Sequence, residues 1–238
     1  MICILITKRL LPTFNIIKPR RLSSKAEFNN VVECPSYFHL SNSFIDFPNE
    51  AKHLIDCMHI QYDFIDEDQE KSLFDEADPF IKRLRYQVDH WDDAIHQYRE
   101  TEKLKWNPEN TKIINKVREL AFPRHVGQIK YVHILDLDKD GYIKPHIDAV
   151  RFCGDTIAGL SLLSDSIMRL VNEQNKSLYG DILLKRRSLY VMKGTARFDY
   201  THEILANEKS IFKGETIVKN RRISIICRNE PDPKYMGI

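Results

Sequence analysis

Cysteine is scarce in this chain of 238 residues. The cysteines are odd in number, lie far apart and form no CxxC pair. Their positions are Cys3, Cys34, Cys57, Cys153 and Cys227. A disulfide framework or a zinc ribbon needs closer, paired spacing, so the sequence excludes both. We interpret the thiols as reduced and mostly structural, in a reducing compartment.

The chain also lacks an excess of either charge and any long apolar run. Its 36 basic residues nearly balance its 34 acidic residues. Such a balance creates no global field for a polyanion, so a nucleic acid would need a local basic patch. No run approaches the roughly 18 apolar residues that a transmembrane helix needs, and we expect no membrane span.

Acidic residues are absent from the beginning of the chain, where the first one is Glu27. This start carries arginines, lysines and serines between short apolar stretches. An acid-free, Arg- and Ser-bearing amphipathic start is typical of a mitochondrial transit peptide. We therefore predict a transit peptide over residues 1–25 and a location in the mitochondrial matrix. A disordered basic arm is the alternative.

The first half of the chain has mainly helical patterns. Residues 47–65, 69–104 and 109–120 carry apolar side chains at helical spacing. We predict that residues 26–120 form an N-terminal helical extension.

From about residue 126 the pattern changes to short β-rich runs. Turn signals such as Asp140-Gly141 and Gly180-Asp181 separate them. Six or more short strands with regular turns favour a sandwich, a jelly roll or a small barrel. The predicted fold is α+β, with a β core over residues 121–230, a helical layer before it and a tail over 231–238.

A candidate metal site begins with His146-Ile147-Asp148. In an extended chain, residues i and i+2 point to the same side, so both side chains can reach one ion. His202 is the candidate third ligand, brought near by folding. Two histidines and one carboxylate bound on one face leave positions open for a cosubstrate and oxygen, as non-haem iron oxygenases require.

A second pair of this kind, His90-Trp91-Asp92, shows that the motif also occurs by chance. Its surroundings have helical character. On a helix, residues i and i+2 lie about 200° apart around the axis, too far apart to share an ion. Geometry therefore favours His146 and Asp148.

The segment from Arg222 to Arg228 has the period-2 pattern of a strand. Arg222, Ser224, Ile226 and Arg228 share one face, and Ile223, Ile225 and Cys227 share the other. Buried arginines need anionic partners, and a guanidinium can grip a carboxylate through two hydrogen bonds. We assign Arg222 to the distal carboxylate of 2-oxoglutarate and place Arg228 nearer the metal-bound end. A solvated edge strand is the alternative.

These motifs and their intervening text resemble the AlkB family of dioxygenases, most strongly a mitochondrial member. The resemblance runs from about Tyr86 to Arg228 and includes HID, TIAGLSLLSDSIMRLV, SLYVMKGTARFDYTHEIL, RRISIICR and DHWDDAIHQYRETEK. It implies a double-stranded β-helix (jelly roll) that uses Fe(II), 2-oxoglutarate and O2. The implied iron ligands are His146, Asp148 and His202. The implied 2-oxoglutarate contacts are Tyr190, Arg222, Ile223, Ser224 and Arg228.

The chain also departs from the demethylating members of that family. Their Asn-x-Tyr pair before the HxD motif is replaced by Leu135 and Leu137, and Tyr190 is the candidate to supply the missing hydroxyl. We find no basic, aromatic-rich hairpin before residue 126 that could serve as a nucleotide-recognition lid. Base-flipping enzymes need such stacking groups, so repair of duplex DNA is not expected.

Residues 136–141 copy the D-x-D-x-D-G opening of a calcium-binding EF-hand loop. Position twelve is Ile147, where a bidentate glutamate should complete the calcium shell. We predict an acidic β-turn here.

Three functions remain open from the sequence. A protein-side-chain hydroxylase is favoured, because the nucleotide lid is missing. The alternatives are a demethylase of mitochondrial RNA and a 2-oxoglutarate- and iron-binding regulatory module with little turnover. The resemblance implies roles in programmed necrosis after alkylation damage and in fatty-acid metabolism.

Overall fold

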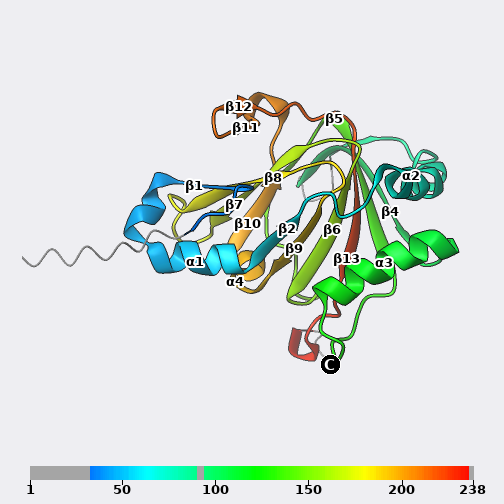
Figure 1. The fold of residues 1–238 in the computed structure, drawn as a ribbon, viewed down its shortest axis with the longest axis horizontal. Coiled ribbons are helices and arrows are strands. Elements are labelled where there is room, and N and C mark those ends of the chain that lie inside the picture. The colour runs from blue at the N-terminus through cyan, green and yellow to red at the C-terminus, as the bar shows by residue number, and fades with distance from the viewer. Residues whose placement is uncertain (1–32, 90–93, 236–238) are drawn as a thin grey trace, which may run out of the picture. The chain divides into compact units, whose positions relative to one another are not determined.

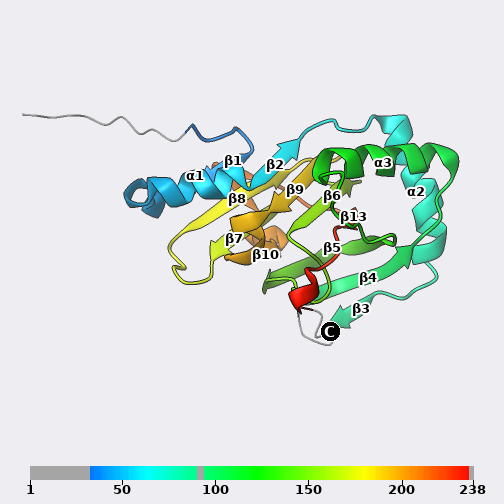
Figure 2. The same ribbon diagram turned by 90° about the horizontal axis from the view of Figure 1, so that it is seen from below.

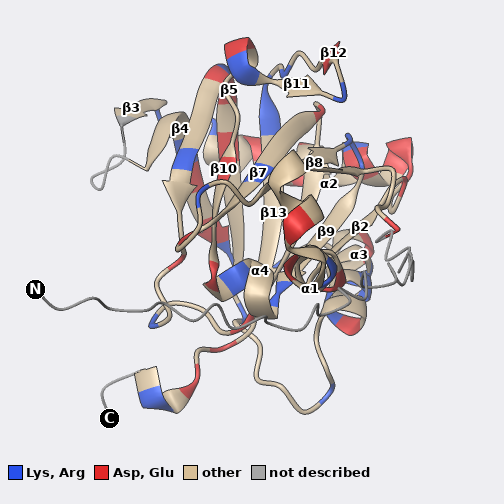
Figure 3. Cartoon of the chain, turned by 90° about the vertical axis from the view of Figure 1, so that its left-hand side faces the viewer, with Lys and Arg blue, Asp and Glu red and all other residues tan. Residues whose placement is uncertain are grey.

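The computed structural model describes residues 33–89 and 94–235. The predicted transit peptide and the pair His90/Asp92 lie outside these residues. Among the described residues, no helix combines the length and apolar character needed to cross a bilayer. Acidic and basic residues are interspersed over the elements (Figure 3).

An antiparallel sheet of eleven strands organises the described chain (Figure 1). Its main path has the order β1-β8-β7-β10-β5-β13-β6-β9-β2, and β4 joins β3 to β5. The strands are β1 (Phe38–Leu40), β2 (Met58–Gln61), β3 (Gln87–Asp89), β4 (Ile95–Lys103), β5 (Val132–His146), β6 (Thr156–Leu162), β7 (Ser166–Asn172), β8 (Tyr179–Leu184), β9 (Leu189–Lys193), β10 (Tyr200–Ile204) and β13 (Arg222–Arg228). A separate hairpin pairs β11 (Ile211–Phe212) with β12 (Glu215–Thr216).

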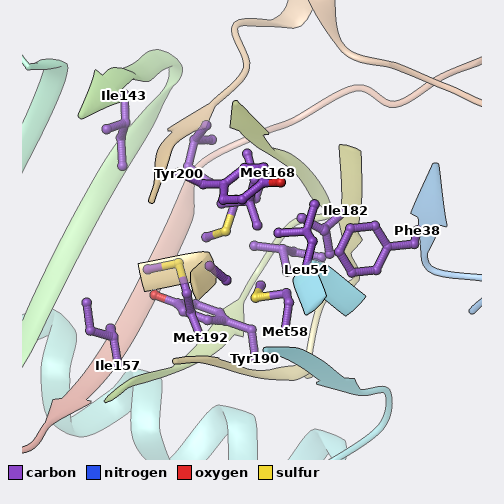
Figure 4. Packing of buried hydrophobic residues seen from close by; sticks show 14 of the residues in the cluster. Phe38, Leu54, Met58, Ile143, Ile157, Met168, Ile182, Tyr190, Met192 and Tyr200 are labelled. Atoms are coloured by element: carbon purple, nitrogen blue, oxygen red, sulfur yellow. The ribbon is translucent and has the colours of Figure 1, made fainter. Parts of the chain in front are cut away.

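The sheet is curled, as shown by side chains from its two ends that lie in one buried core. Ile182 of β8 and Met168 of β7 belong to the same buried cluster as Tyr190 and Met192 of β9 (Figure 4). These strands stand far apart in the sheet order, so the two halves face each other. This is the predicted jelly roll, and we call the cluster between its halves the inner core.

The helices begin where the sequence supplies caps. In α2 (Glu67–Ile81), the Asp66 carboxylate accepts a hydrogen bond from the Gln69 amide at 2.8 Å, and the Gln69 side chain accepts one from the Asp66 amide. Before α3 (Pro108–Ala121), the Asn107 side chain caps the Asn110 amide at 2.8 Å. Shorter helices are α1 (Pro48–Asp56), α4 (Gly194–Phe198), and the 3-10 turns η1 (Asn42–Asp46), η2 (Asn207–Lys209) and η3 (Pro233–Tyr235).

Helices α2 and α3 cover the outer face of the sheet at β5, β13 and β6 (Figure 2). A second buried cluster, the rear core, fills the space between them. It joins Leu73 of α2 and Val117 of α3 to Leu160 of β6 and Ile225 of β13. Strand β13 therefore separates two cores.

The prediction of a mainly helical first half is wrong in part. Strand β2 follows α1 directly, and β3 and β4 occupy much of the segment between residues 82 and 104. The strand alternation of β4 was hidden because the strand buries a charged side chain, Arg99. Arg99 is only 9% exposed, and its Nε donates to the carboxylate of Asp136 at 2.8 Å.

The predicted turn at residues 136–141 is also wrong, because β5 continues through it without interruption. Gly141 makes this possible. A Cβ at that position would lie 2.5 Å from the Gln97 carbonyl oxygen of β4, where the pairing of the two strands is irregular. Asp136 is fully buried in ion pairs with Arg99 and Arg221, so its carboxylate serves the fold.

Candidate metal and cosubstrate site

Two neighbouring strands bring the three candidate ligands together. His146 is the last residue of β5, and it pairs in register with His202 of β10. Asp148 follows two residues later, with its Oδ1 3.4 Å from Nε2 of His146 and 4.0 Å from Nε2 of His202. One donor atom from each residue lies within 4.8 Å of the others, so the set could hold one metal ion.

The backbone orients His146 for this role. Its Nδ1 lies 2.9 Å from the carbonyl oxygen of Lys144, which can only accept a hydrogen bond. Nδ1 therefore carries the proton, and the lone pair of Nε2 is available to a metal. Such a second hydrogen bond fixes the tautomer and ring orientation of many metal-binding histidines.

The surroundings of the other two ligands, His202 and Asp148, shift the pKa values of both side chains. Burial, together with the nearby His146, lowers the pKa of His202 to about 4, so its imidazole is neutral at physiological pH. Burial opposes ionisation of Asp148, but the interactions with the nearby His146, His202 and Arg197 outweigh it. The pKa of that carboxyl consequently lies well below its usual range. His202 and Asp148 thus present a neutral imidazole and a carboxylate, the protonation states that metal binding requires.

A narrow cavity of about 100 Å³ extends from the triad into the inner core, and we call it the inner chamber. Holding one water takes on the order of 10–15 Å³, so the chamber admits a compact small molecule. Its lining includes the triad, Ile95, His133, Leu135, Ile143, Ile157, Met168, Tyr190, Met192, Ile204, Arg222, Ser224, Ile226 and Arg228.

Arg222 is the charged group at the buried part of this chamber. Its side chain is 2% exposed, and its Nη2 donates to the Ser161 hydroxyl at 2.9 Å. Its Nε has no hydrogen-bond partner within residues 33–89 and 94–235. Burial lowers the pKa of Arg222 to about 10, so the guanidinium stays charged at neutral pH. A buried charge without a counter-ion is costly, and the chamber is therefore suited to an anion.

The predicted alternation of β13 is confirmed. Arg222, Ser224, Ile226 and Arg228 line the inner chamber, whereas Ile225 and Cys227 lie in the rear core. Ile223 also lies in the rear core, so its side chain does not line the chamber. The alternative of a solvated edge strand is wrong, since β13 pairs with β5 on one side and β6 on the other.

The remaining predicted positions divide between lining and packing. Tyr190 is 5% exposed and lines the chamber, and burial raises its pKa to about 12, so the phenol keeps its proton. Leu135 lines the chamber, and Leu137 is packed in the inner core opposite Arg222 in the pairing of β5 and β13.

The inner chamber adjoins a wider, open cavity of about 680 Å³, which we call the outer groove. The two share His146, Asp148, His133, Ile95 and Arg228. The outer groove is therefore the route by which a larger molecule reaches the triad.

Sequence reasoning missed the groove residues contributed by β4, Glu100 and Glu102. Both face the groove, and Glu100 lies 2.8 Å from Nε2 of His133. The signal was their i, i+2 spacing, which has meaning only once the segment is known to be a strand.

Replacing Gly159 with alanine is expected to lower the free energy of unfolding by about 1–3 kcal/mol, the usual cost of overpacking. A Cβ there would lie 2.5 Å from the Tyr190 ring, which is too buried to move freely. The displaced ring should also weaken cosubstrate binding. Urea unfolding measures the first effect and calorimetric titration the second. A second change, Tyr190→Leu, should restore stability in the alanine variant, and failure to do so would contradict this account.

Comparison with known families gives a match over most of the chain. Residues 39–228 match the family model described as the 2OG-Fe(II) oxygenase superfamily. The chain is 46% identical over 179 residues to a bovine protein named "Alpha-ketoglutarate-dependent dioxygenase alkB homolog 7, mitochondrial", covering 75% of this chain and 81% of that protein. It is 47% identical to the mouse protein of the same name, covering 71% and 76%. The resemblance to the AlkB family is confirmed.

Solved structures support the fold. The structure described as "The structure of OsALKBH1" superposes with a TM-score of 0.53 at 11% identity, covering 72% of this chain and 97% of that chain. A Trichoplax adhaerens prolyl hydroxylase, in complex with a peptide of hypoxia inducible factor, gives a TM-score of 0.53 at 9% identity, covering 76% and 86%. At these identities the likeness concerns the fold alone.

Proposed function

Since the chain belongs to the 2OG-Fe(II) oxygenase superfamily, we propose that it hydroxylates protein side chains, with its iron held by His146, Asp148 and His202. The family identifies the enzyme as a 2-oxoglutarate-dependent dioxygenase that uses Fe(II) and O2. The ligand assignment and the choice of substrate are the proposal.

Fe(II) with its cosubstrate would supply the oxidation. A substrate C–H bond becomes C–OH with one oxygen atom of O2, while the other oxygen atom and 2-oxoglutarate give succinate and CO2. The protein's own residues position the ion and the cosubstrate and exclude bulk water. His146, Asp148 and His202 would hold the ion, and Arg222, whose Nε has no partner among the described residues, would bind the distal carboxylate of the cosubstrate. Tyr190 offers a hydroxyl, and Ile157, Met168 and Ile226 keep bulk water out.

The observation that carries this proposal is the placement of Arg222. A charged guanidinium whose Nε has no partner among residues 33–89 and 94–235 is buried in the cavity that starts at the triad. Arg118 and Arg197 also have unpartnered nitrogens among the described residues, but neither of them lines this chamber. The chamber thus joins a metal-binding set at one end to a carboxylate-binding group at the other.

The outer groove favours a protein substrate over a nucleic acid. Phosphate backbones are bound by basic and amide groups, which supply most of the affinity. Here Glu100 and Glu102 face the groove beside the triad. Of the groove's two arginines, Arg228 lies 3.4 Å from the Glu102 carboxylate, and the other is Arg151. Acidic side chains at that position would repel a polyphosphate, so duplex DNA is disfavoured and RNA is the weaker alternative.

The cellular part of the proposal rests on relatives and composition. The bovine and mouse relatives are named mitochondrial. The acid-free beginning of the chain supports import into the matrix. Roles in necrosis after alkylation damage and in fatty-acid metabolism belong to the same proposal, and the family resemblance supports them.

Mass spectrometry of mitochondrial protein and RNA tests the function. Each is incubated with Fe(II), 2-oxoglutarate and either the intact enzyme or its His202→Ala variant. We expect succinate and a gain of one oxygen on specific peptides with the intact enzyme only. Loss of one methylene from RNA instead would identify a demethylase. Absence of any substrate-dependent succinate would favour the regulatory module.

A further inference from the structure

The outer groove has an acidic wall on one strand. Glu100 and Glu102 are two residues apart on β4, so their side chains share the face of the sheet that lines the groove. They pair across to Leu135 and His133 of β5, both of which also line the inner chamber. Two carboxylates therefore lie beside the entrance to the triad.

These carboxylates have protein partners but retain capacity for a ligand. The Glu102 side chain is 52% exposed, and its contact with Arg228 is long, at 3.4 Å. The Glu100 side chain is 33% exposed, with Nε2 of His133 at 2.8 Å from its Oε2. The Glu102 carboxylate offers about four lone-pair positions, so it can accept donors from a ligand while keeping Arg228, and Glu100 adds its negative charge beside it.

The rest of the wall combines apolar residues with Thr101, His133 and the arginines Arg151 and Arg228. Ile95, Ile129 and Ile147 line the groove, and Phe152 stands at it with 58% of its surface exposed. Long basic side chains bury their methylene stems along apolar surface while the charged head seeks polar groups. An aliphatic wall next to carboxylates matches both parts of such a side chain.

We propose that the outer groove receives a cationic side chain, a lysine or arginine of the protein substrate, with Glu100 and Glu102 recognising its charge. The inference rests on the proposed function and specifies its substrate class. The methylene stem then passes the open side of the triad, where its C–H bonds are available for hydroxylation. Arg151, whose guanidinium lies 4.7 Å from the Phe152 ring centroid, also lines the groove, so its positive charge opposes the attraction of Glu100 and Glu102 for cations.

Peptide binding tests the inference directly. Fluorescein-labelled peptides of equal length, with a central lysine, arginine, glutamine or glutamate, are titrated into the full-length protein with Mn(II) and N-oxalylglycine. We expect the lysine or arginine peptide to bind about tenfold or more tightly than the glutamine peptide, with the preference falling as salt rises. The double variant Glu100→Gln/Glu102→Gln should lose that preference, and Glu100→Lys/Glu102→Lys should favour the glutamate peptide.

Glu119→Gln on α3, exposed and outside the groove lining, is the matched control and should keep the preference for cations. Equal binding of all four peptides, or tighter binding of a single-stranded RNA of matched length, overturns the inference. The proteomic experiment separates the two proposals. Oxygen gained on proteins, but not on lysine or arginine, removes this inference alone, whereas no oxygen gained on any protein removes the proposed function as well.

Discussion

Replacing His146 with alanine is expected to abolish stoichiometric Fe(II) binding and, with it, succinate formation. His146 provides one of three donor groups that converge within 4.8 Å. Its ring is already oriented by a contact of Nδ1 with the Lys144 carbonyl oxygen. With only two of the three protein ligands left, the affinity for Fe(II) should become too low to retain one ion per chain.

The measurement is iron content per chain after anaerobic loading and desalting, with circular dichroism to confirm folding. His125→Ala is the control, because His125 is exposed and lies outside the triad. That variant should load iron like the intact protein. One tightly bound Fe(II) per chain in the His146 variant would remove this residue from the metal site.

Replacing Arg222 with methionine should lower the affinity for 2-oxoglutarate without lowering the free energy of unfolding. The affinity for 2-oxoglutarate is expected to fall about 100- to 1000-fold, because truncating one partner of a buried charge pair typically costs 2–5 kcal/mol. The free energy of unfolding of the ligand-free protein should stay unchanged or rise by up to about 4 kcal/mol, since methionine fills the space without a buried charge. Arg222 is 2% exposed and has an unpartnered Nε in the described part of the chain.

Calorimetric titration of the Mn(II)-loaded protein with 2-oxoglutarate gives the first quantity, and urea unfolding gives the second. Arg124→Met, at an exposed position, should leave both unchanged. Unaltered cosubstrate affinity in the Arg222 variant would contradict its assignment to the carboxylate. A large loss of stability with retained affinity would identify Arg222 as a structural residue instead.

Some residues of the candidate site could be predicted because they are close together in the sequence or follow the regular alternation of a strand. His146 and Asp148 are two residues apart at a strand end, and β13 alternates cleanly between a chamber face and a rear-core face. His202 needed the family resemblance, because its pairing opposite His146 depends on how the sheet curls. The β-rich second half was predictable from its turns and short apolar runs.

The first half was harder to predict, since long-range pairing overrides local periodicity there. Strand β4 buries Arg99 against Asp136, and Gly141 accommodates the irregular backbone of β4 at Gln97. Neither contact has a local signature. The same misreading hid Glu100 and Glu102, whose common face exists only in a strand.

Because β13 lies between two cores, substitutions behind the sheet can affect the residues that line the inner chamber. The strand that carries Arg222 rests its opposite side on α3 through Ile223, Ile225 and Cys227. An added methyl group behind the sheet would tilt the guanidinium, and a misplacement of about 1 Å can cost roughly 100-fold in rate. Substitutions on α3, at positions such as Ile113 and Val117, are therefore expected to alter turnover although these residues do not line the chamber.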